Sequence, residues 1–243
     1  MPYNNLTFLV SSCDKYAVCW APFCHGLKKY WPEHPKKLVF ITNHKAAPCG
    51  ESFKVGEDQG WAHNLLAALE QVETDFILYA QEDYWIKNQV PDSAIHDYLE
   101  YLRSNQMDMI RLYPAPGPDK VWDRDERLGL LATESQYRAS LQMALWRKST
   151  LISLINPDES PWQFEVKGTG RSRQYVKRLF CVSKRRFGVD YVFTAIINGY
   201  WSEKAYNYAQ IEGISIPFKE FPVKPLNKKI YDHLRYAAYR AKR

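Results

Sequence analysis

The chain has 243 residues, of which 46% are hydrophobic and 25% charged, the composition of a globular protein with a sizeable core. No run approaches 18 apolar residues, and the first residues lack a basic stretch followed by an apolar one. We therefore expect neither a transmembrane helix nor a signal peptide. The net charge of +6 lies in residues 219–243, with eight Lys or Arg against two Asp or Glu. The neutral remainder excludes a general nucleic-acid-binding surface.

Short apolar runs separated by segments of helical spacing predict an α/β protein. Residues 6–10 and 37–43 are two such runs with a helical stretch between them, which indicates a parallel βαβ unit. Residues 76–80 are apolar without a break, which suits a strand buried on both faces of a mainly parallel sheet. Further strands are expected at 107–113, 139–147 and 178–183, helices at 60–72, from 91, at 149–156 and 202–213, and loops at 44–59 and 114–137.

Two adjacent carboxylates, Glu82 and Asp83, follow the central run. In open α/β sheets, ligands bind beyond the carboxyl ends of the strands. Mg²⁺ and Mn²⁺ prefer oxygen ligands and bridge to phosphates. The pair therefore indicates a divalent-cation site for a phosphorylated ligand, with an ordinary charged strand end that caps a helix as the alternative.

The five cysteines, at positions 13, 19, 24, 49 and 181, are odd in number and contain no C-x-x-C spacing. This pattern favours reduced thiols in a cytoplasmic protein over a disulfide framework or a zinc site.

Four stretches in the same order resemble the nucleotide-sugar-dependent glycosyltransferases of the GT-A fold, and more narrowly a bacterial group that builds surface polysaccharides. The resemblance implies a Rossmann-like, mixed, mainly parallel central sheet flanked by helices. It implies one domain over residues 1–218, with a donor-binding half at about 1–113 and an acceptor-side half at about 139–218. The stretches are SSCDKY at 11–16, GWAHNLLAAL at 60–69, ILYAQEDYW at 77–85, and SLQMALWRK, ESPWQFE and GTGRSR between 140 and 173.

The resemblance gives the acidic pair distinct roles. Asp83 matches the usual ligand to the metal on the sugar-nucleotide diphosphate, and Glu82 matches a neighbour that holds the ribose or the sugar. Gln81 stands where the family's Asp-x-Asp motif has its first acid, and an amide binds Mn²⁺ or Mg²⁺ more weakly than a carboxylate. A divalent cofactor is expected, with its affinity reduced by this departure.

Glu165 is the candidate catalytic base that deprotonates the acceptor hydroxyl. Trp162 and Phe164 precede it and are able to stack on a sugar and to raise the carboxyl pKa by desolvation. The alternative is that Glu165 forms an ion pair with Arg171 or Arg173.

Further donor-binding residues follow from the resemblance. Ser12 and Asp14 lie where the family's first loop contacts the nucleotide base and ribose, with an Asx turn as the alternative. Trp61 packs against the base or anchors its helix, and its place on the apolar stripe favours the anchor.

In the acceptor-side half of the chain, Gln142 is a further donor-binding candidate that would contact the sugar or the acceptor. Arg171 and Arg173 lie in an expected loop with two glycines and are donor-binding candidates that would clamp a diphosphate. A solvated basic loop is the alternative for the two arginines.

The resemblance implies an inverting glycosyltransferase of the hexosyltransferase type, acting in surface polysaccharide or glycan synthesis. A UDP- or dTDP-sugar is the expected donor, and a saccharide or lipid-linked molecule the acceptor. Two alternatives stay open. A nucleotidyltransferase on sugar phosphates usually has a Gly-rich loop after the first strand, which residues 11–16 lack. A non-catalytic carbohydrate- or nucleotide-binding module would also suit the 15% of aromatic residues.

The basic C-terminal tail has helical apolar spacing over residues 226–243. We expect a basic amphipathic helix that rests on an anionic membrane surface at the inner face of the membrane. The alternative is a helix that packs on the domain or mediates a dimer. The apolar positions are Ile230, Leu234, Ala238 and Ala241.

Overall fold

The computed structural model describes residues 3–104, 106–217 and 219–223. The chain divides into two compact units, Met1–Tyr191 and Val192–Arg243, which we describe separately.

The first unit contains a nine-stranded sheet of order β3-β2-β1-β4-β8-β5-β9-β7-β6. The strands β3, β2, β1 and β4 are mutually parallel, and β8 runs antiparallel to both β4 and β5. Next to β5, β9 is parallel and β7 then runs against both β9 and β6, so that only β8 and β7 oppose the other strands. The predicted mixed, mainly parallel sheet is confirmed. The strands are β1 (Leu6–Ser11), β2 (Leu38–Thr42), β3 (Glu51–Lys54), β4 (Phe76–Gln81), β5 (Met109–Arg111), β6 (Lys120–Trp122), β7 (Asp125–Leu130), β8 (Ala144–Arg147) and β9 (Leu179–Val182).

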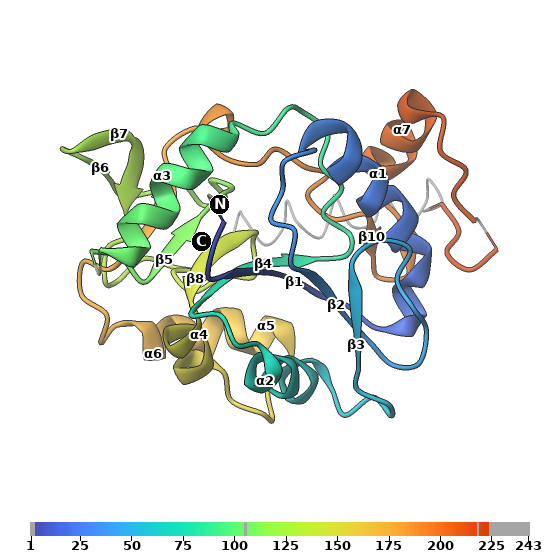
Figure 1. The fold of residues 1–243 in the computed structure, drawn as a ribbon, viewed down its shortest axis with the longest axis horizontal. Coiled ribbons are helices and arrows are strands. Elements are labelled where there is room, and N and C mark those ends of the chain that lie inside the picture. Colours follow the sequence, from blue (N-terminus) through green and yellow to red (C-terminus); the bar gives the residue numbers. More distant parts are fainter. Residues whose placement is uncertain (1–2, 105, 218, 224–243) are drawn as a thin grey trace, which may run out of the picture. The chain divides into compact units, whose positions relative to one another are not determined.

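Helices cover both faces of this sheet (Figure 1). On one face lie α1 and α3, and on the other lie α2, α4 and a continuous helical run over residues 161–172. We call the last element the π-helical run, because its middle segment, η2, is a π-helix. The bounds are η1 (Asp14–Cys19, a 3₁₀ helix), α1 (Trp20–Tyr30), α2 (Trp61–Gln71), α3 (Asp92–Arg103), α4 (Lys148–Leu154), α5 (Pro161–Gln163), η2 (Phe164–Gly168), α6 (Thr169–Ser172) and η3 (Arg185–Phe187, a 3₁₀ helix).

Alternation of side chains along the strands builds the two core layers. Phe8 of β1 points to the α1 face, where its ring lies 6.1 Å from that of Phe23, which in turn lies 5.5 Å from Phe40. All three are fully buried, and each contributes roughly 1.5–3 kcal/mol of hydrophobic free energy. Tyr79 of β4 points to the opposite face, where its hydroxyl accepts a hydrogen bond from Trp61 of α2. Burial on both faces explains the unbroken apolar runs of β1, β2 and β4.

Three predictions about elements are wrong. The predicted loop at 44–59 contains β3, and the predicted loop at 114–137 contains β6 and β7. The strands β3 and β6 lie at the sheet edges and have exposed residues, so they lack the apolar run of a buried strand. The segment with Arg171 and Arg173, predicted as a loop, is helical up to Ser172, where the π-helical run ends, and Arg173 caps it.

The cysteine prediction is wrong at two positions. Cys24 of α1 and Cys49 of the loop after β2 form a disulfide with a Cα–Cα distance of 6.0 Å. An odd number of cysteines and the lack of a C-x-x-C motif do not exclude a pairing between residues 25 apart that the βαβ fold brings together. Cys13, Cys19 and Cys181 are free thiols.

The second unit contains a hairpin and a helix. Strands β10 (Ile196–Ile197) and β11 (Tyr200–Trp201) pair through Asn198 and Gly199, whose φ angles of 52° and 77° suit a type I′ turn. Helix α7 (Glu203–Glu212) confirms the predicted helix, and the hydroxyl of Ser202 caps it by accepting the N–H of Ala205.

No helix in the part of the chain that the structure describes has the length and apolar character needed to cross a membrane. The predicted amphipathic helix at 226–243 lies outside the described residues.

Candidate active site

The acidic pair lies at the shared carboxyl end of β1 and β4. Ser11 and Gln81 are paired as the last residues of these two strands, and Glu82 and Asp83 follow directly. The N–H of Tyr84 donates to the carbonyl of Gln81 at 3.2 Å, which closes a turn around the two acids. Both acids are less than 10% exposed, at 9% and 8%. The fold thus holds two neighbouring carboxyl groups out of water at the edge where α/β sheets bind ligands.

Burial, and then the charge of Asp83, raises the pKa of Glu82 well above its ordinary value. The effect reaches the neighbouring η1 segment, where burial and the charges of Glu82 and Asp83 raise the pKa of the Cys19 thiol. Cys13 and Tyr16 are affected in the same way, by burial and then by Glu82. No Lys or Arg within the described residues forms a salt bridge with Glu82. A cationic ligand would therefore relieve the electrostatic cost of ionising Glu82.

The donor set of the acidic pair suits a hard divalent cation. Mg²⁺ and Mn²⁺ are commonly held by one or two carboxylates, with substrate phosphates and water completing the shell. No group of three or more Asp, Glu, His or Cys within the described ranges is arranged to hold a metal ion. Two carboxylates are too few for a closed protein cage, so a metal at Glu82 and Asp83 would need further ligands from a substrate or from water.

Glu165 lies on the π segment at the same edge of the sheet. Its Oε1 accepts a hydrogen bond from the N–H of Leu141 at 3.0 Å, three residues before β8 begins. Since β8 is antiparallel to β4 and β5, its amino end adjoins their carboxyl ends. Burial raises the pKa of Glu165, and the Leu141 hydrogen bond and the charge of Arg111 oppose that rise. Glu165 is thus a half-buried carboxylate poised to take a proton at higher pH than an exposed glutamate.

The predicted alternative for Glu165, an ion pair with a nearby arginine, is wrong. Arg171 instead binds both oxygens of Glu159, at 2.9 and 2.5 Å, and a main-chain carbonyl. Arg173 pairs with Glu134 at 2.7 Å on the exposed surface. With these partners, a diphosphate clamp by the two arginines stays a prediction, and we do not include them in the site.

Arg111 is a site residue that the sequence reasoning missed. It ends β5 opposite Ala144 of β8, and it is only 1% exposed. Its Nη1 donates to the carbonyl of Ala115, while Nε and Nη2 have no hydrogen-bond partner among the described residues. Burial lowers its pKa, and the nearby Cys181, Tyr191 and Glu165 raise it. The sequence does indicate this residue, because an arginine inside the apolar strand MDMIRLY would bury a charge, which is costly unless the charge has a role.

Two buried tyrosines, Tyr84 and Tyr191, pack beside Gln142. The hydroxyl of Tyr191 donates to Gln142 Oε1 at 2.6 Å and accepts the N–H of Met143 at 3.2 Å. The ring of Tyr84 stacks on that of Tyr191 with centroids 4.7 Å apart. Gln142 is buried, and this bond orients its side-chain carbonyl oxygen.

Ser12 and Asp14 lie in the loop after β1. The carboxylate of Asp14 accepts main-chain N–H bonds from Asn43, His44 and Lys45 at 3.0, 3.0 and 3.1 Å. Burial raises the pKa of Asp14, but these bonds together lower it by more, and the net shift is downward. The carboxylate therefore bridges to the loop after β2 and does not form the local Asx turn that we considered.

Trp20 and Trp61 attach the helices α1 and α2 to this edge of the sheet through hydrogen bonds of their indole N–H groups. The indole N–H of Trp20 donates to Ser12 Oγ at 2.7 Å, which holds the first loop against α1. The indole N–H of Trp61 donates to Tyr79, and its ring lies 5.3 Å from that of Phe164. Trp61 thus anchors α2 to both the sheet and the π-helical run, and a contact of its ring with a nucleotide base stays a prediction.

The sequence matches no model of a protein family and no curated protein. Solved structures of similar fold do exist. One is residues 1–349 of TarS from S. aureus, with a TM-score of 0.54, 13% identity, and coverage of 85% of this chain and 64% of that one. The same fragment in complex with UDP-GlcNAc aligns with a TM-score of 0.52, 15% identity, and coverage of 85% and 65%.

A third structure is the mannosyltransferase PcManGT from Pyrobaculum calidifontis in complex with GDP-Man and Mn²⁺. It aligns with a TM-score of 0.51 and 12% identity, and the coverage is 81% of this chain and 58% of that one. The chain spans less than two thirds of each of the three structures. At such identities the likeness concerns the fold alone, and it confirms the predicted Rossmann-like α/β class of the GT-A type.

Proposed function

We propose that the protein is a glycosyltransferase that moves a sugar from a nucleotide-sugar donor to a saccharide or lipid-linked acceptor, with inversion at the anomeric carbon. The observation that carries the proposal is the placement of Glu82, Asp83 and Glu165 at one edge of the sheet, each removed from water to some degree. The similar folds solved with UDP-GlcNAc and with GDP-Man and Mn²⁺ support a nucleotide sugar as ligand. A UDP- or dTDP-sugar is the first donor to test.

The strand order indicates how the donor would lie across the edge of the sheet. The first loop and the loop after β2, joined through Asp14, lie on the β1 side of β4, and β8 and β5 lie on the other. The nucleoside would lie over the joined loops, the diphosphate at Asp83, and the sugar towards Gln142 and Glu165. A divalent metal held by Asp83, with Glu82 beside it, would neutralise the charge that develops on the departing diphosphate.

In the proposed reaction, the acceptor hydroxyl oxygen attacks the anomeric carbon as the bond from that carbon to the diphosphate oxygen breaks. The hydroxyl proton passes to Glu165, and the nucleoside diphosphate leaves with the electron pair of the broken bond. The raised pKa of Glu165 suits this task, because a base accepts a proton more readily as its pKa rises towards the working pH. The Leu141 N–H holds one carboxylate oxygen in place, and the other is left to receive the proton.

A thermal-shift panel tests the proposal, since a ligand that binds only the folded state raises the melting temperature by mass action. UDP-, GDP-, CMP- and dTDP-sugars are compared with and without Mn²⁺, and binders are then assayed for release of the nucleoside diphosphate. Sugar-nucleotide turnover that disappears in Asp83→Ala supports the transferase.

Two results would exclude the proposal, one from a separate assay with nucleoside triphosphates and sugar phosphates and one from the panel itself. Pyrophosphate release from a nucleoside triphosphate and a sugar phosphate would identify a nucleotidyltransferase. Binding of the ligands without turnover at any acceptor tested would identify a binding module.

A further inference from the structure

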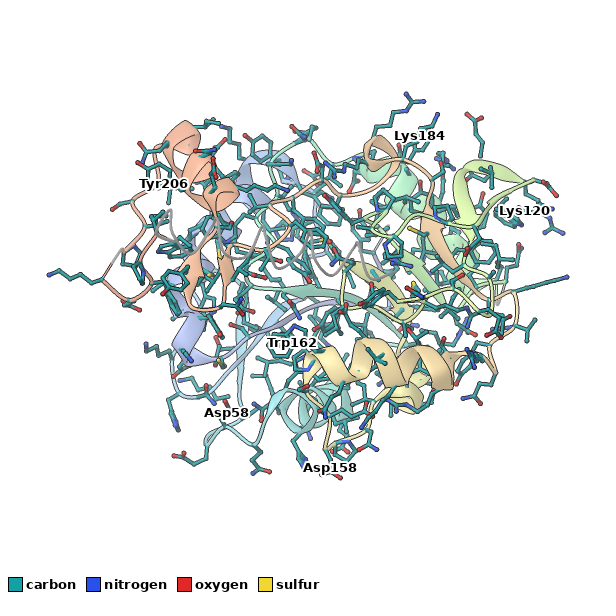
Figure 2. The ribbon with its side chains drawn as sticks, turned by 180° about the vertical axis from the view of Figure 1, so that it is seen from behind. Asp58, Lys120, Asp158, Trp162, Lys184 and Tyr206 are labelled. Atoms are coloured by element: carbon teal, nitrogen blue, oxygen red, sulfur yellow. A yellow bond between two sulfur atoms is a disulfide. The ribbon has the colours of Figure 1, made fainter. Side chains whose placement is uncertain are left out.

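Trp162 is the most exposed aromatic side chain among the described residues, at 77% exposure. Other tryptophans of the first unit, such as Trp31, Trp85 and Trp146, are fully buried. In Figure 2, Trp162 lies at the beginning of the yellow helix that crosses below the sheet. An indole that is left in water on an ordered helix is a candidate for contact with a ligand.

The burial pattern of the π-helical run shows that the indole of Trp162 lies on its outward face. Ser160 and Gln163 form a capping box, and Pro161 occupies the first helical position, so the beginning of the helix is rigid. Buried residues recur every fourth position, at Phe164, Gly168 and Ser172, and mark the inward face of the π-helical run. The two exposed apolar residues, at positions 162 and 166, lie on the outward face.

The exposed indole is a neighbour of the candidate base. Trp162 and Glu165 are three residues apart on one helical run, within a single turn of it. Glu165 is half-buried, with Oε1 on the Leu141 N–H, whereas Phe164 points inward against Trp61. Of the two aromatic residues that were candidates to stack on a sugar, only Trp162 is accessible.

We propose that Trp162 is the stacking platform of the acceptor subsite and that the acceptor group next to the reaction is a pyranose ring. A pyranose presents an apolar face of C–H groups and a rim of hydroxyls. The apolar face would cover the indole and the side chain of Val166, while one rim hydroxyl would reach the carboxylate of Glu165. This inference rests on the proposed function, and it assigns the acceptor to the saccharides, as opposed to a lipid phosphate that offers no such ring.

Steady-state kinetics of the full chain test this subsite. At saturating donor, we expect Trp162→Ala to raise the KM for a saccharide acceptor at least tenfold, with a much smaller fall in kcat. Trp162→Phe keeps an aromatic face and should recover most of the loss. The matched control is Val121→Ala, an exposed apolar residue on the edge strand β6. An unchanged acceptor KM in Trp162→Ala would overturn the inference, and so would a weaker thermal shift by UDP, which would assign the ring to the donor.

A binding measurement separates this inference from the proposed function. Tryptophan fluorescence of the wild-type protein is titrated with methyl pyranosides and disaccharides, and Trp162→Phe identifies the signal of this indole. A saturable change that disappears in Trp162→Phe supports the platform even if no nucleotide sugar is turned over. A change that appears with anionic phospholipid vesicles and not with pyranosides would overturn the saccharide assignment in favour of a membrane contact.

Discussion

The β1 and β5 sides of the sheet edge are organised in opposite ways. On the β1 side, Asp14 is saturated with three main-chain hydrogen bonds and has a lowered pKa. On the β4–β5 side, Glu82 and Glu165 are withdrawn from water and have raised pKa values, and two nitrogens of the buried Arg111 have no hydrogen-bond partner in the part of the chain that the structure describes. A charged side chain whose hydrogen bonds are all made, such as Asp14, holds loops together. Buried charged side chains with few partners and shifted pKa values instead indicate where a reaction is expected.

The strongest test of this contrast is Glu165→Gln. The amide keeps the shape of the side chain but cannot take the hydroxyl proton, so transfer should slow by about 10² to 10⁴, the usual contribution of a general base. The thermal shift by UDP should be retained, because the donor side is unchanged. The matched control is Asp158→Asn, an exposed carboxylate in the turn that precedes the π-helical run. A variant with wild-type turnover would move the base elsewhere.

Asp83→Asn is expected to have the next largest effect. Loss of one charge that positions the metal and diphosphate should reduce turnover by about 10² to 10³, and the response to Mn²⁺ should disappear. Folding should be preserved, because the amide removes a buried negative charge and not a packed group. Asp123→Asn, an exposed site in the β6–β7 hairpin, is the control. Full activity with an unchanged Mn²⁺ response would exclude the metal role of Asp83.

Asp14→Ala should act through stability. It removes charged hydrogen bonds to three N–H groups at a partly exposed site, and we expect unfolding to become about 1–2 kcal/mol easier. Because the pKa of Asp14 is lowered, its stabilisation is present above the ordinary pKa of 3.8 and is lost as the pH falls through the lowered value. The free energy of unfolding from urea titrations at pH 7 and pH 3 measures this, and the variant should differ from wild type mainly at pH 7. Equal losses at both pH values would contradict the role of the carboxylate charge.

The smallest expected effect is that of Arg111→Met on the pH profile. The charge of Arg111 holds down the pKa of Glu165, so its removal should move the acidic limb of kcat/KM to higher pH, by up to about one unit. Arg111→Lys keeps the charge and should leave the limb nearer its wild-type position. If the limb does not move while the melting temperature falls, Arg111 acts only on packing.

The fold class was predictable from the sequence because parallel strands that are buried on both faces consist of unbroken runs of apolar residues. The runs at β1, β2, β4 and β9 predicted their strands well. The edge strands β3 and β6 escaped prediction because one side of an edge strand meets solvent, and their composition then resembles that of a loop.

At the site, the sequence indicated which carboxylates follow a strand, but not which charges are neutralised. Glu159 and Glu165 each lie three residues from Trp162 along the chain, and only three-dimensional contacts separate the one that pairs with Arg171 from the one that does not. The Cys24–Cys49 bond and the burial of Arg111 likewise depend on elements far apart along the chain.

The place of β8 in the sheet has a consequence for the order in which the protein can fold. Strand β8 lies between β4 and β5, although it follows both along the chain. Until residue 147 has left the ribosome, β4 presents an open, apolar edge and β5 has no neighbour on that side. A fragment that ends near residue 113 would therefore expose an unpaired strand and aggregate. The two halves of the sheet are joined by a late strand, and they are not independent folding units.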